Sequence, residues 1–314
     1  MISKTQSDKL NCTTNLRFTR NARTAWEIVL RSVSSRFKPK VLLPAYIGYT
    51  DREGSGVFDP IEATSSEYAF YGVTRNLGIE MDPFEEHVRS GKVNIALVIH
   101  YFGFCRNDMN RVRSQCDEYN VTLVEDCAHT FNLGLKGRKL SNYGDFSFFS
   151  IHKYLPTTCG GILKVNTARF DLEPHRDLEG APTTVLEQYA ISDYEEIYRR
   201  RINNFKLYES LLPRHEGLEI LFELKGEDIP QSFPVRIKSG RRKDLYFYLM
   251  KKCMPTTALY YQLITQIARN EFPLSYEISN EILNLPLHQD ITSDDVSRIC
   301  AQIDEYFQVH SKAV

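Results

Sequence analysis

The sequence has no paired cysteine motif, no long apolar run and almost no net charge. Its seven cysteines are odd in number and show no C-x-x-C spacing, so we expect reduced structural thiols and no zinc or other metal site. No apolar stretch approaches the roughly 20 residues of a transmembrane helix, and residues 1–14 contain no hydrophobic signal region. A formal net charge of −1 gives no general attraction to nucleic acid or to an anionic membrane. We therefore expect a soluble protein of the cytoplasm that binds neither nucleic acid nor membrane.

The sequence also lacks a G-x-G-x-x-G segment after any predicted strand. That absence argues against a dinucleotide-binding oxidoreductase. With 314 residues, of which 42% are apolar and 25% charged, the composition is that of a folded protein. A chain of this length can form one large core and a second, smaller one.

Predicted strands alternate with predicted helices over the first half of the chain. Short apolar runs at residues 41–46, 96–103 and 122–127 indicate buried strands, and residues 62–73 indicate a more polar strand or strand pair. Helical patterns separate them, at residues 21–37, 82–91 and 106–120. This alternation predicts an α/β fold with a mostly parallel sheet.

The pattern changes after residue 166. Residues 167–189 are polar and irregular, with Pro174 among them, and a long helix is predicted from residue 193 to 212. Beyond this helix, the sequence predicts a strand at 231–237 and helices at 243–253 and 292–307. We therefore predict a large α/β domain over residues 1–185 and a smaller α+β domain over residues 186–314.

The central stretch, residues 122–165, combines an acid and an amine at the ends of two predicted strands. Asp126 ends one apolar run and Lys153 follows the next, and the carboxyl ends of parallel strands line the ligand crevice of such sheets. A lysine held away from water is a nucleophile that forms Schiff bases with carbonyls and with pyridoxal phosphate. Pyridoxal phosphate also requires an acidic side chain beside its ring nitrogen. Ser150 could bind the cofactor phosphate, and Gly160 and Gly161 allow a close turn beside the site.

Each of these residues, considered alone, has an ordinary structural explanation. Asp126 could cap a helix, Ser150 could occupy a turn and Lys153 could be a solvated loop amine. The first turn of the helix after Asn21 offers free amides, which can bind an anion, but every helix start does so. The combination in one stretch favours a cofactor site.

Several motifs, in this order along the chain, resemble one family. They are Pro44-Ala45-Tyr46, His100-Tyr101-Phe102-Gly103, Glu125-Asp126-Cys127-Ala128-His129, Gly144-Asp145, Ser150-x-x-Lys153, Gly160-Gly161 and Ile282-Leu283-Asn284-Leu285-Pro286-Leu287-His288. They look like those of the DegT/DnrJ/EryC1/StrS family of pyridoxal-phosphate-dependent sugar aminotransferases. The resemblance implies fold type I, the aspartate aminotransferase fold, in which the site normally lies at a homodimer interface.

The resemblance also implies roles for the central residues. Lys153 matches the lysine that holds pyridoxal 5′-phosphate covalently and then transfers protons during the reaction. Asp126 matches the aspartate that keeps the ring nitrogen protonated, and His129 matches a residue beside the ring's phenolic oxygen.

The phosphate end and the ring face are implied in the same way. Thr24, with the amides of Ala22 and Arg23, matches the phosphate-binding helix start, and Ser150 is a further phosphate ligand.

The chain departs from the family pattern at the ring face and after Lys153. An aromatic residue usually stacks on the ring at the position held here by Gly48, so Tyr46 or Tyr49 is expected to substitute. The family's arginine-asparagine-histidine-glycine segment and its glycine-x-asparagine-tyrosine-arginine loop are not found. The arginine run at 199–201 is expected to form a solvated helix face.

The expected reaction moves an amino group from an amino acid, glutamate by resemblance, to a keto-sugar that carries a nucleotide. Two alternatives stay open. One is another pyridoxal-phosphate reaction on the same fold, such as a dehydratase or lyase, although the dehydratase members replace with histidine the lysine kept here as Lys153. The other is a non-catalytic relative that binds a ligand.

Overall fold

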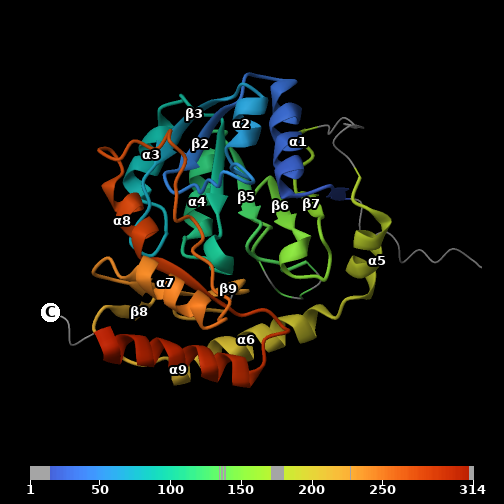
Figure 1. The fold of residues 1–314 in the computed structure, drawn as a ribbon. Helices are drawn as coiled ribbons and strands as arrows, with labels where there is room; N and C mark the ends of the chain where they lie inside the picture. Colours follow the sequence, from blue (N-terminus) through green and yellow to red (C-terminus); the bar gives the residue numbers. More distant parts are fainter. Residues whose placement is uncertain are drawn as a thin grey trace, which may run out of the picture.

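Two β-sheets organise the chain in the computed structural model (Figure 1). The structure describes residues 15–133, 135, 137, 139–170, 180–226 and 228–310. The first half of the chain forms a seven-stranded sheet, and the second half forms a three-stranded sheet. Residues 1–14, with Cys12 among them, and Pro174 lie outside the described residues.

The large sheet is mostly parallel. Its strands are β1 (Leu16–Thr19), β2 (Lys40–Pro44), β3 (Glu67–Tyr71), β4 (Ile95–Ile99), β5 (Thr122–Cys127), β6 (Phe146–Ser150) and β7 (Gly161–Val165). They lie in the order β1-β7-β6-β5-β4-β2-β3. Strands β2 to β6 pair in parallel, whereas β7 is antiparallel to both β6 and β1. The predicted α/β class with a mostly parallel sheet is confirmed.

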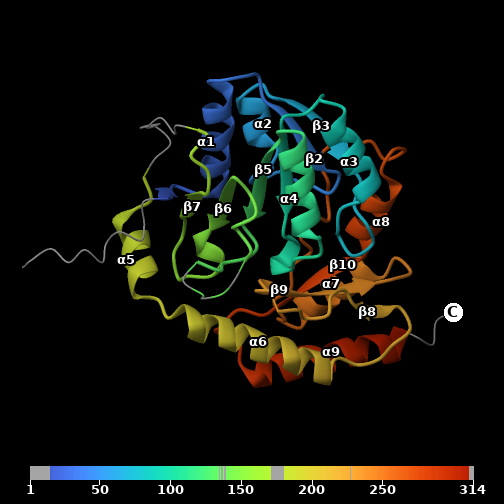
Figure 2. The same cartoon turned by 180° about the vertical axis from the view of Figure 1, so that it is seen from behind.

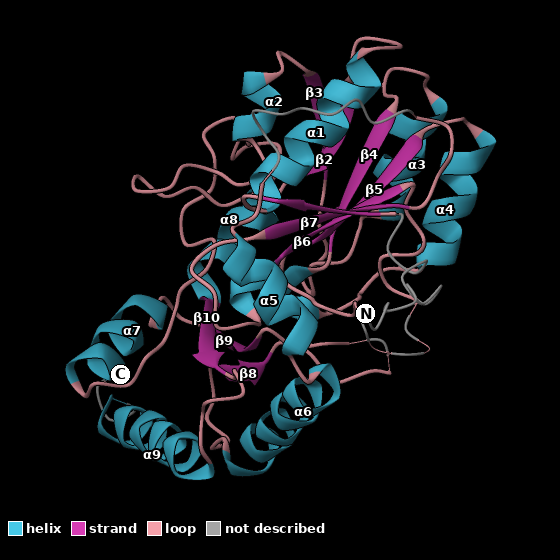
Figure 3. Cartoon of the chain, turned by 90° about the vertical axis from the view of Figure 1, so that its right-hand side faces the viewer, coloured by secondary structure: helices cyan, strands magenta, loops and turns pink. Residues whose placement is uncertain are grey.

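Helices cover both faces of this sheet because side chains alternate along each strand. In β4, Ile95, Leu97 and Ile99 share a core with the buried face of α1 (Ala22–Ser34), whereas Ala96 and Val98 belong to the core on the other face. Figure 3 shows α1 and the short α2 (Asp59–Ala63) on one side, and α3 (Met81–Arg89) and α4 (Met109–Glu118) on the other. Burial on both faces explains why β4 is apolar throughout.

The small sheet is antiparallel, in the order β10-β9-β8. Its strands are β8 (Leu218–Ile220), β9 (Ser232–Ile237) and β10 (Ile282–Pro286). The helices of this half are α5 (Thr183–Ile191), α6 (Tyr194–Leu211), α7 (Arg242–Lys251), α8 (Pro273–Glu281) and α9 (Ser293–His310). Figure 2 shows α6 and α9 side by side below the sheets, where they pack together. The predicted domain boundary at residue 185 falls inside α5 and stays a prediction.

Some predicted elements differ from the structure. The predicted strand at 62–73 is wrong in its first part, because α2, which has Pro60 in its first turn, runs to Ala63 and only β3 is extended. The predicted strand at 96–103 ends at Ile99, and a 3₁₀ turn, η2 (Tyr101–Gly103), follows it. Phe102 adopts a left-handed backbone with φ 56° inside that turn, which no extended strand can contain. Helix α8 was not predicted.

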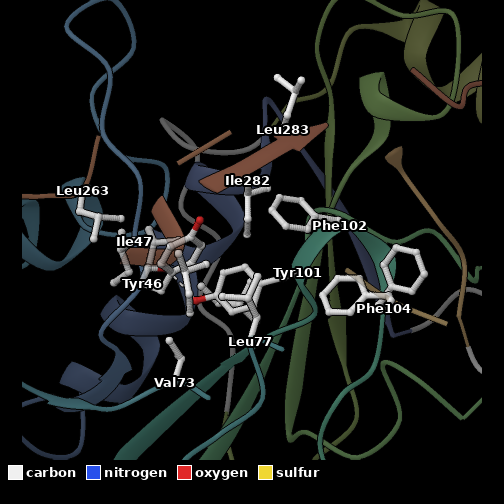
Figure 4. Close-up of a cluster of buried hydrophobic side chains, with 14 of the residues drawn as sticks. Tyr46, Ile47, Val73, Leu77, Tyr101, Phe102, Phe104, Leu263, Ile282 and Leu283 are labelled. Carbon is white, nitrogen blue, oxygen red and sulfur yellow. Dashed lines mark hydrogen bonds between the residues drawn. The ribbon is translucent and has the colours of Figure 1, made fainter. Parts of the chain in front are cut away.

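A cluster of buried aromatic and aliphatic side chains joins the two sheets (Figure 4). Tyr46, Tyr101 and Phe102 approach it from the large sheet, and Ile282 and Leu283 of β10 approach it from the small one. The two halves therefore share one continuous core beside the ends of the parallel strands.

Backbone hydrogen bonds reinforce this junction. The carbonyl oxygens of Phe102 and Gly103 accept from Gln231 N at 2.8 Å and from Ile229 N at 2.9 Å. Gly103 is required there, because a Cβ on it would lie 2.1 Å from the carbonyl oxygen of Ile229. None of the helices in the described part of the chain combines the length and apolar character that a bilayer crossing requires.

Candidate active site

A cavity of about 760 Å³ lies at the carboxyl ends of the central parallel strands. Strands β4, β5 and β6 contribute Ile99, Asp126 and Ser150 to its wall, and the start of α1 contributes residues 21–23. Loop 47–57 after β2 and segment 257–261 from the second half complete its walls. The cavity occupies the crevice that the fold class provides for a ligand.

Lys153 and Asp126 both line this cavity. Lys153 ends the 3₁₀ turn η3 (Ile151–Lys153) directly after β6, and burial lowers the pKa of its amine to about 8. Asp126 is buried near the end of β5, and burial raises the pKa of its carboxyl to about 6, although the Ala128 N–H at 2.8 Å and the Lys153 charge oppose that rise. The charge of each side chain acts on the pKa of the other, so the predicted acid and amine lie together.

His129 is held in one orientation. Its Nδ1 accepts a hydrogen bond from the Phe102 N–H at 3.2 Å, and the Phe102 ring stacks on it at 5.8 Å with an interplanar angle of 11°. Because Nδ1 accepts, the ring proton is assigned to Nε2. Burial lowers the pKa of His129 well below its usual value, so the imidazole is neutral.

The start of α1 presents free backbone donors to the cavity. Ala22 and Arg23 line the cavity, and within the described residues no acceptor is recorded for their N–H groups. Thr24 lies outside the cavity wall, because its amide donates to Asn21 Oδ1 at 2.9 Å and its hydroxyl donates to the same oxygen at 3.1 Å. Thr24 thus completes the helix cap, and Ala22 and Arg23 keep the anion-binding geometry.

The Gly160-Gly161 pair fixes this helix start beside Lys153. A Cβ on Gly161 would lie 2.3 Å from the carbonyl carbon of Asn21 and 2.6 Å from Ala22 N, so only glycine permits the approach. Gly160 donates to the Arg20 carbonyl at 2.8 Å, and its own carbonyl accepts from Ile151 N at 2.9 Å. The pair joins the free amides of α1 to the turn that bears Lys153.

The remaining predicted residues divide between the cavity and the core. Ser150 is buried in the cavity wall, with its Oγ 3.3 Å from His152 Nδ1. Tyr49 also lines the cavity, whereas Tyr46 is fully buried outside the wall, with its ring against Tyr101. Of the two tyrosines predicted to replace the missing aromatic side chain, only Tyr49 therefore reaches the cavity.

Sequence reasoning missed the far wall of the cavity. Tyr260 and Tyr261 come from a loop more than 100 residues after Lys153, and no local pattern marks them. The unusual glycine at position 48 was the available signal, since Tyr260 lies directly against it. Glu53, in loop 47–57 after β2, was also missed. Its negative charge favours the protonated form of the Lys153 amine.

The prediction of a solvated face for residues 199–201 is wrong for Arg201. Its side chain is only 1% exposed, and its guanidinium lies 4.2 Å from the centre of the Tyr154 ring. It donates to the carbonyl oxygens of Pro230 and Gln231 at 3.2 and 3.1 Å, and to that of Lys153 at 3.0 Å. Carbonyl oxygens replace the water that solvates an exposed arginine.

Comparison with known proteins identifies the family. The sequence model of the DegT/DnrJ/EryC1/StrS aminotransferase family matches residues 64–169 and 186–304. The chain belongs to this family. The aminotransferase is 22% identical over 289 residues to the GDP-perosamine synthase of Vibrio cholerae, covering 80% of this chain and 73% of the relative. It is 22% identical over 260 residues to the dTDP-3-amino-3,6-dideoxy-alpha-D-galactopyranose transaminase of Aneurinibacillus thermoaerophilus, covering 72% and 69%.

Solved structures share the fold. The aminotransferase TlmJ from Streptoalloteichus hindustanus superposes with a TM-score of 0.75 at 18% identity, covering 95% of this chain and 87% of that one. Spr1654 from Streptococcus pneumoniae in its PLP-form gives a TM-score of 0.77 at 17% identity, covering 96% and 88%. These matches confirm fold type I for the chain.

The protein is thus a pyridoxal-phosphate-dependent aminotransferase. The cavity contains the kinds of groups that this cofactor requires: an amine with a lowered pKa, a buried carboxyl group, a neutral imidazole and unpaired helix-start amides.

Proposed function

We propose that this aminotransferase moves an amino group from glutamate to a keto-sugar linked to a nucleotide. The single observation that carries the proposal is that Lys153 and Asp126 line one cavity beside the free amides of α1, close enough for the charge of each to act on the pKa of the other. The named relatives make or process amino sugars linked to GDP or dTDP, which supports the same class of substrate here.

Each side chain has one task in the proposed site. When bound, pyridoxal phosphate supplies an aldehyde that links covalently to amines and a ring that takes up electrons from the reacting carbon. Lys153 Nζ holds it covalently at rest and, once released, moves the proton of the α-carbon of glutamate. The Asp126 carboxylate accepts a hydrogen bond from the protonated ring nitrogen and thereby stabilises its positive charge.

The other residues orient the cofactor. The N–H groups of Ala22 and Arg23, with the Ser150 hydroxyl, donate to the phosphate at the positive end of α1. His129 donates from Nε2 to the phenolic oxygen, since its Nδ1 is occupied by the Phe102 N–H. As in the family pattern, the functional unit is proposed to be a homodimer that completes the site.

Absorbance spectroscopy tests the proposal. Protein loaded with pyridoxal phosphate should show the band of the lysine-linked cofactor, and glutamate should convert that band to the one of pyridoxamine phosphate. Lys153→Ala should lose the band and all turnover, yet still bind cofactor without the covalent link. Adding a GDP- or dTDP-linked keto-sugar to the converted enzyme should restore the band. A Lys153→Ala variant that keeps the band would refute the assignment.

A further inference from the structure

The far wall of the cavity is a segment of the second half, residues 257–261, laid against the loop after β2. Tyr49 donates its N–H to the Gln262 carbonyl at 3.0 Å, and Ile264 donates to the Ile47 carbonyl at 3.0 Å. These two hydrogen bonds fix Tyr260 opposite Gly48.

Position 48 has no room for a side chain, because the Tyr260 ring occupies the space. A Cβ on Gly48 would lie 2.5 Å from Tyr260 Cδ1 and 3.1 Å from Cε1, well inside contact distance. The backbone at Gly48 is not in the left-handed region, so conformation does not require glycine there. Steric exclusion by the tyrosine ring explains the glycine.

The Tyr260 ring is held firmly in this position. Its centre lies 5.1 Å from the centre of the Tyr46 ring, 5.7 Å from that of Tyr101 and 5.8 Å from that of His129. Tyr260 itself has φ 60°, a left-handed backbone that is unusual for a tyrosine and that the surrounding contacts must maintain. One side of the ring is thus packed against the core.

Tyr260 also lines the cavity. It is partly exposed, and Asp126, His129 and Lys153 line the same cavity. Burial raises the pKa of its phenol well above the usual value, and the nearby Asp126 adds to that rise, so the ring stays neutral and electron-rich. A neutral aromatic ring beside the acid suits a cationic aromatic ligand.

We propose that Tyr260 supplies the aromatic surface on which the pyridine ring of the cofactor packs, in place of a side chain at position 48. The inference rests on the site proposed above, in which Asp126 holds the ring nitrogen. It assigns the ring face to the second half of the chain, so that the two halves hold opposite parts of one cofactor.

Three variants test the role of the ring through cofactor affinity, measured by quenching of protein fluorescence on titration with pyridoxal phosphate. Tyr260→Leu should weaken binding about 3- to 10-fold, because it keeps apolar area and removes the aromatic face. Tyr260→Phe should bind as the unchanged protein does. Tyr68→Leu, at a tyrosine that is 44% exposed on β3, is the matched control and should have no effect. Unchanged affinity in Tyr260→Leu would overturn the proposal.

A second experiment moves the aromatic ring from position 260 to position 48, and it tests the proposal even if Tyr260→Leu folds poorly. Gly48→Phe alone should lower the melting temperature of the cofactor-free protein, because the new side chain collides with Tyr260. The double variant Gly48→Phe/Tyr260→Ala should recover much of that loss, and should bind cofactor more tightly than Tyr260→Ala does. A double variant that folds but binds no better than Tyr260→Ala would contradict the aromatic role.

Failure of this inference differs from failure of the proposed function. If Lys153 is not the covalent attachment point, Lys153→Ala keeps the absorbance band whatever happens at Tyr260. If only the Tyr260 assignment is wrong, Lys153→Ala loses the band while Tyr260→Leu retains full affinity.

Discussion

At the scale of single residues, burial sets the protonation of Lys153. Its pKa is lowered to about 8 because the amine is removed from water, and the charges of Asp126 and Glu53 partly oppose that effect. The neutral amine, which is the nucleophile, therefore dominates only above about pH 8.

The rate at which cofactor-free protein links to pyridoxal phosphate should rise with pH and level off above about pH 8 to 9, following the neutral amine. Glu53→Gln should shift this profile to lower pH, because the carboxylate that favours the charged amine is gone. Stopped-flow absorbance measures the rate, with a free amine as reference at each pH. A profile still rising at pH 10 in the unchanged protein would contradict the prediction.

The His129 tautomer is a second prediction at this scale. Because Nδ1 accepts the Phe102 N–H, long-range ¹H–¹⁵N spectra should show a bare Nδ1 and a protonated Nε2. Since burial lowers its pKa, the signal should not convert to the imidazolium form between pH 6 and 8. The spectrum of the His129→Gln variant identifies the His129 signal, because that signal is then missing. A protonated Nδ1 would show that the Phe102 contact does not hold in solution.

Sequence reasoning reached the residues that lie at the ends of strands or just beyond them. Asp126 and Lys153 were found because parallel strands bring their carboxyl ends to one edge, whatever lies between them along the chain. Tyr260 was not found, because its position depends on a loop that approaches from the other half. Thr24 and Tyr46 were predicted from the family resemblance, and neither lines the cavity: Thr24 hydrogen-bonds to Asn21, and the Tyr46 ring packs on Tyr101.

At the scale of elements, helix α6 connects the two halves through Arg201. The residue lies on the same face as the buried Phe205 and Tyr208, at helical spacing. That spacing distinguishes Arg201 from its exposed neighbours Arg199 and Arg200, which pair with Glu196 at the surface, and it could have marked Arg201 as buried from the sequence. Its hydrogen bond to the Lys153 carbonyl connects α6 to the turn that bears Lys153.

Arg201→Lys should destabilise the protein by about 2 to 3 kcal/mol, because a lysine cannot satisfy the same set of buried carbonyl acceptors. Arg200→Lys is the matched control and should change stability by less than about 0.5 kcal/mol. Urea unfolding of the cofactor-loaded protein measures both. Equal effects of the two substitutions would show that the carbonyl contacts of Arg201 contribute little.

The fold class followed from the alternation of strands and helices, but several boundaries did not. Pro60 lies in the first turn of α2, which occupies the start of a predicted strand. The left-handed backbone of Phe102 lies in the turn that follows β4, although the apolar pattern continues through it. The antiparallel pairing of β7 with β1 was also beyond sequence reasoning, since it joins segments that are distant along the chain.

At the scale of the whole molecule, the expected state is a homodimer. Sedimentation equilibrium should give twice the chain mass of 36.4 kDa, largely independent of concentration in the micromolar range. A stable species at the mass of one chain, with full transamination activity, would show that the cavity needs no second copy.

The pairing of β1 with β7 also constrains the order in which the protein can fold. Leu16 pairs with Lys164, and the first turn of α1 rests on Gly161, so this helix start can reach its final position only after β7 has been made. During synthesis, the amino-terminal helix leaves the ribosome long before its partner exists. Closing so large a loop is slow, because its entropy is lost before its contacts form. The free amides of α1 therefore reach their place beside the Lys153 turn only late in the folding of each new chain.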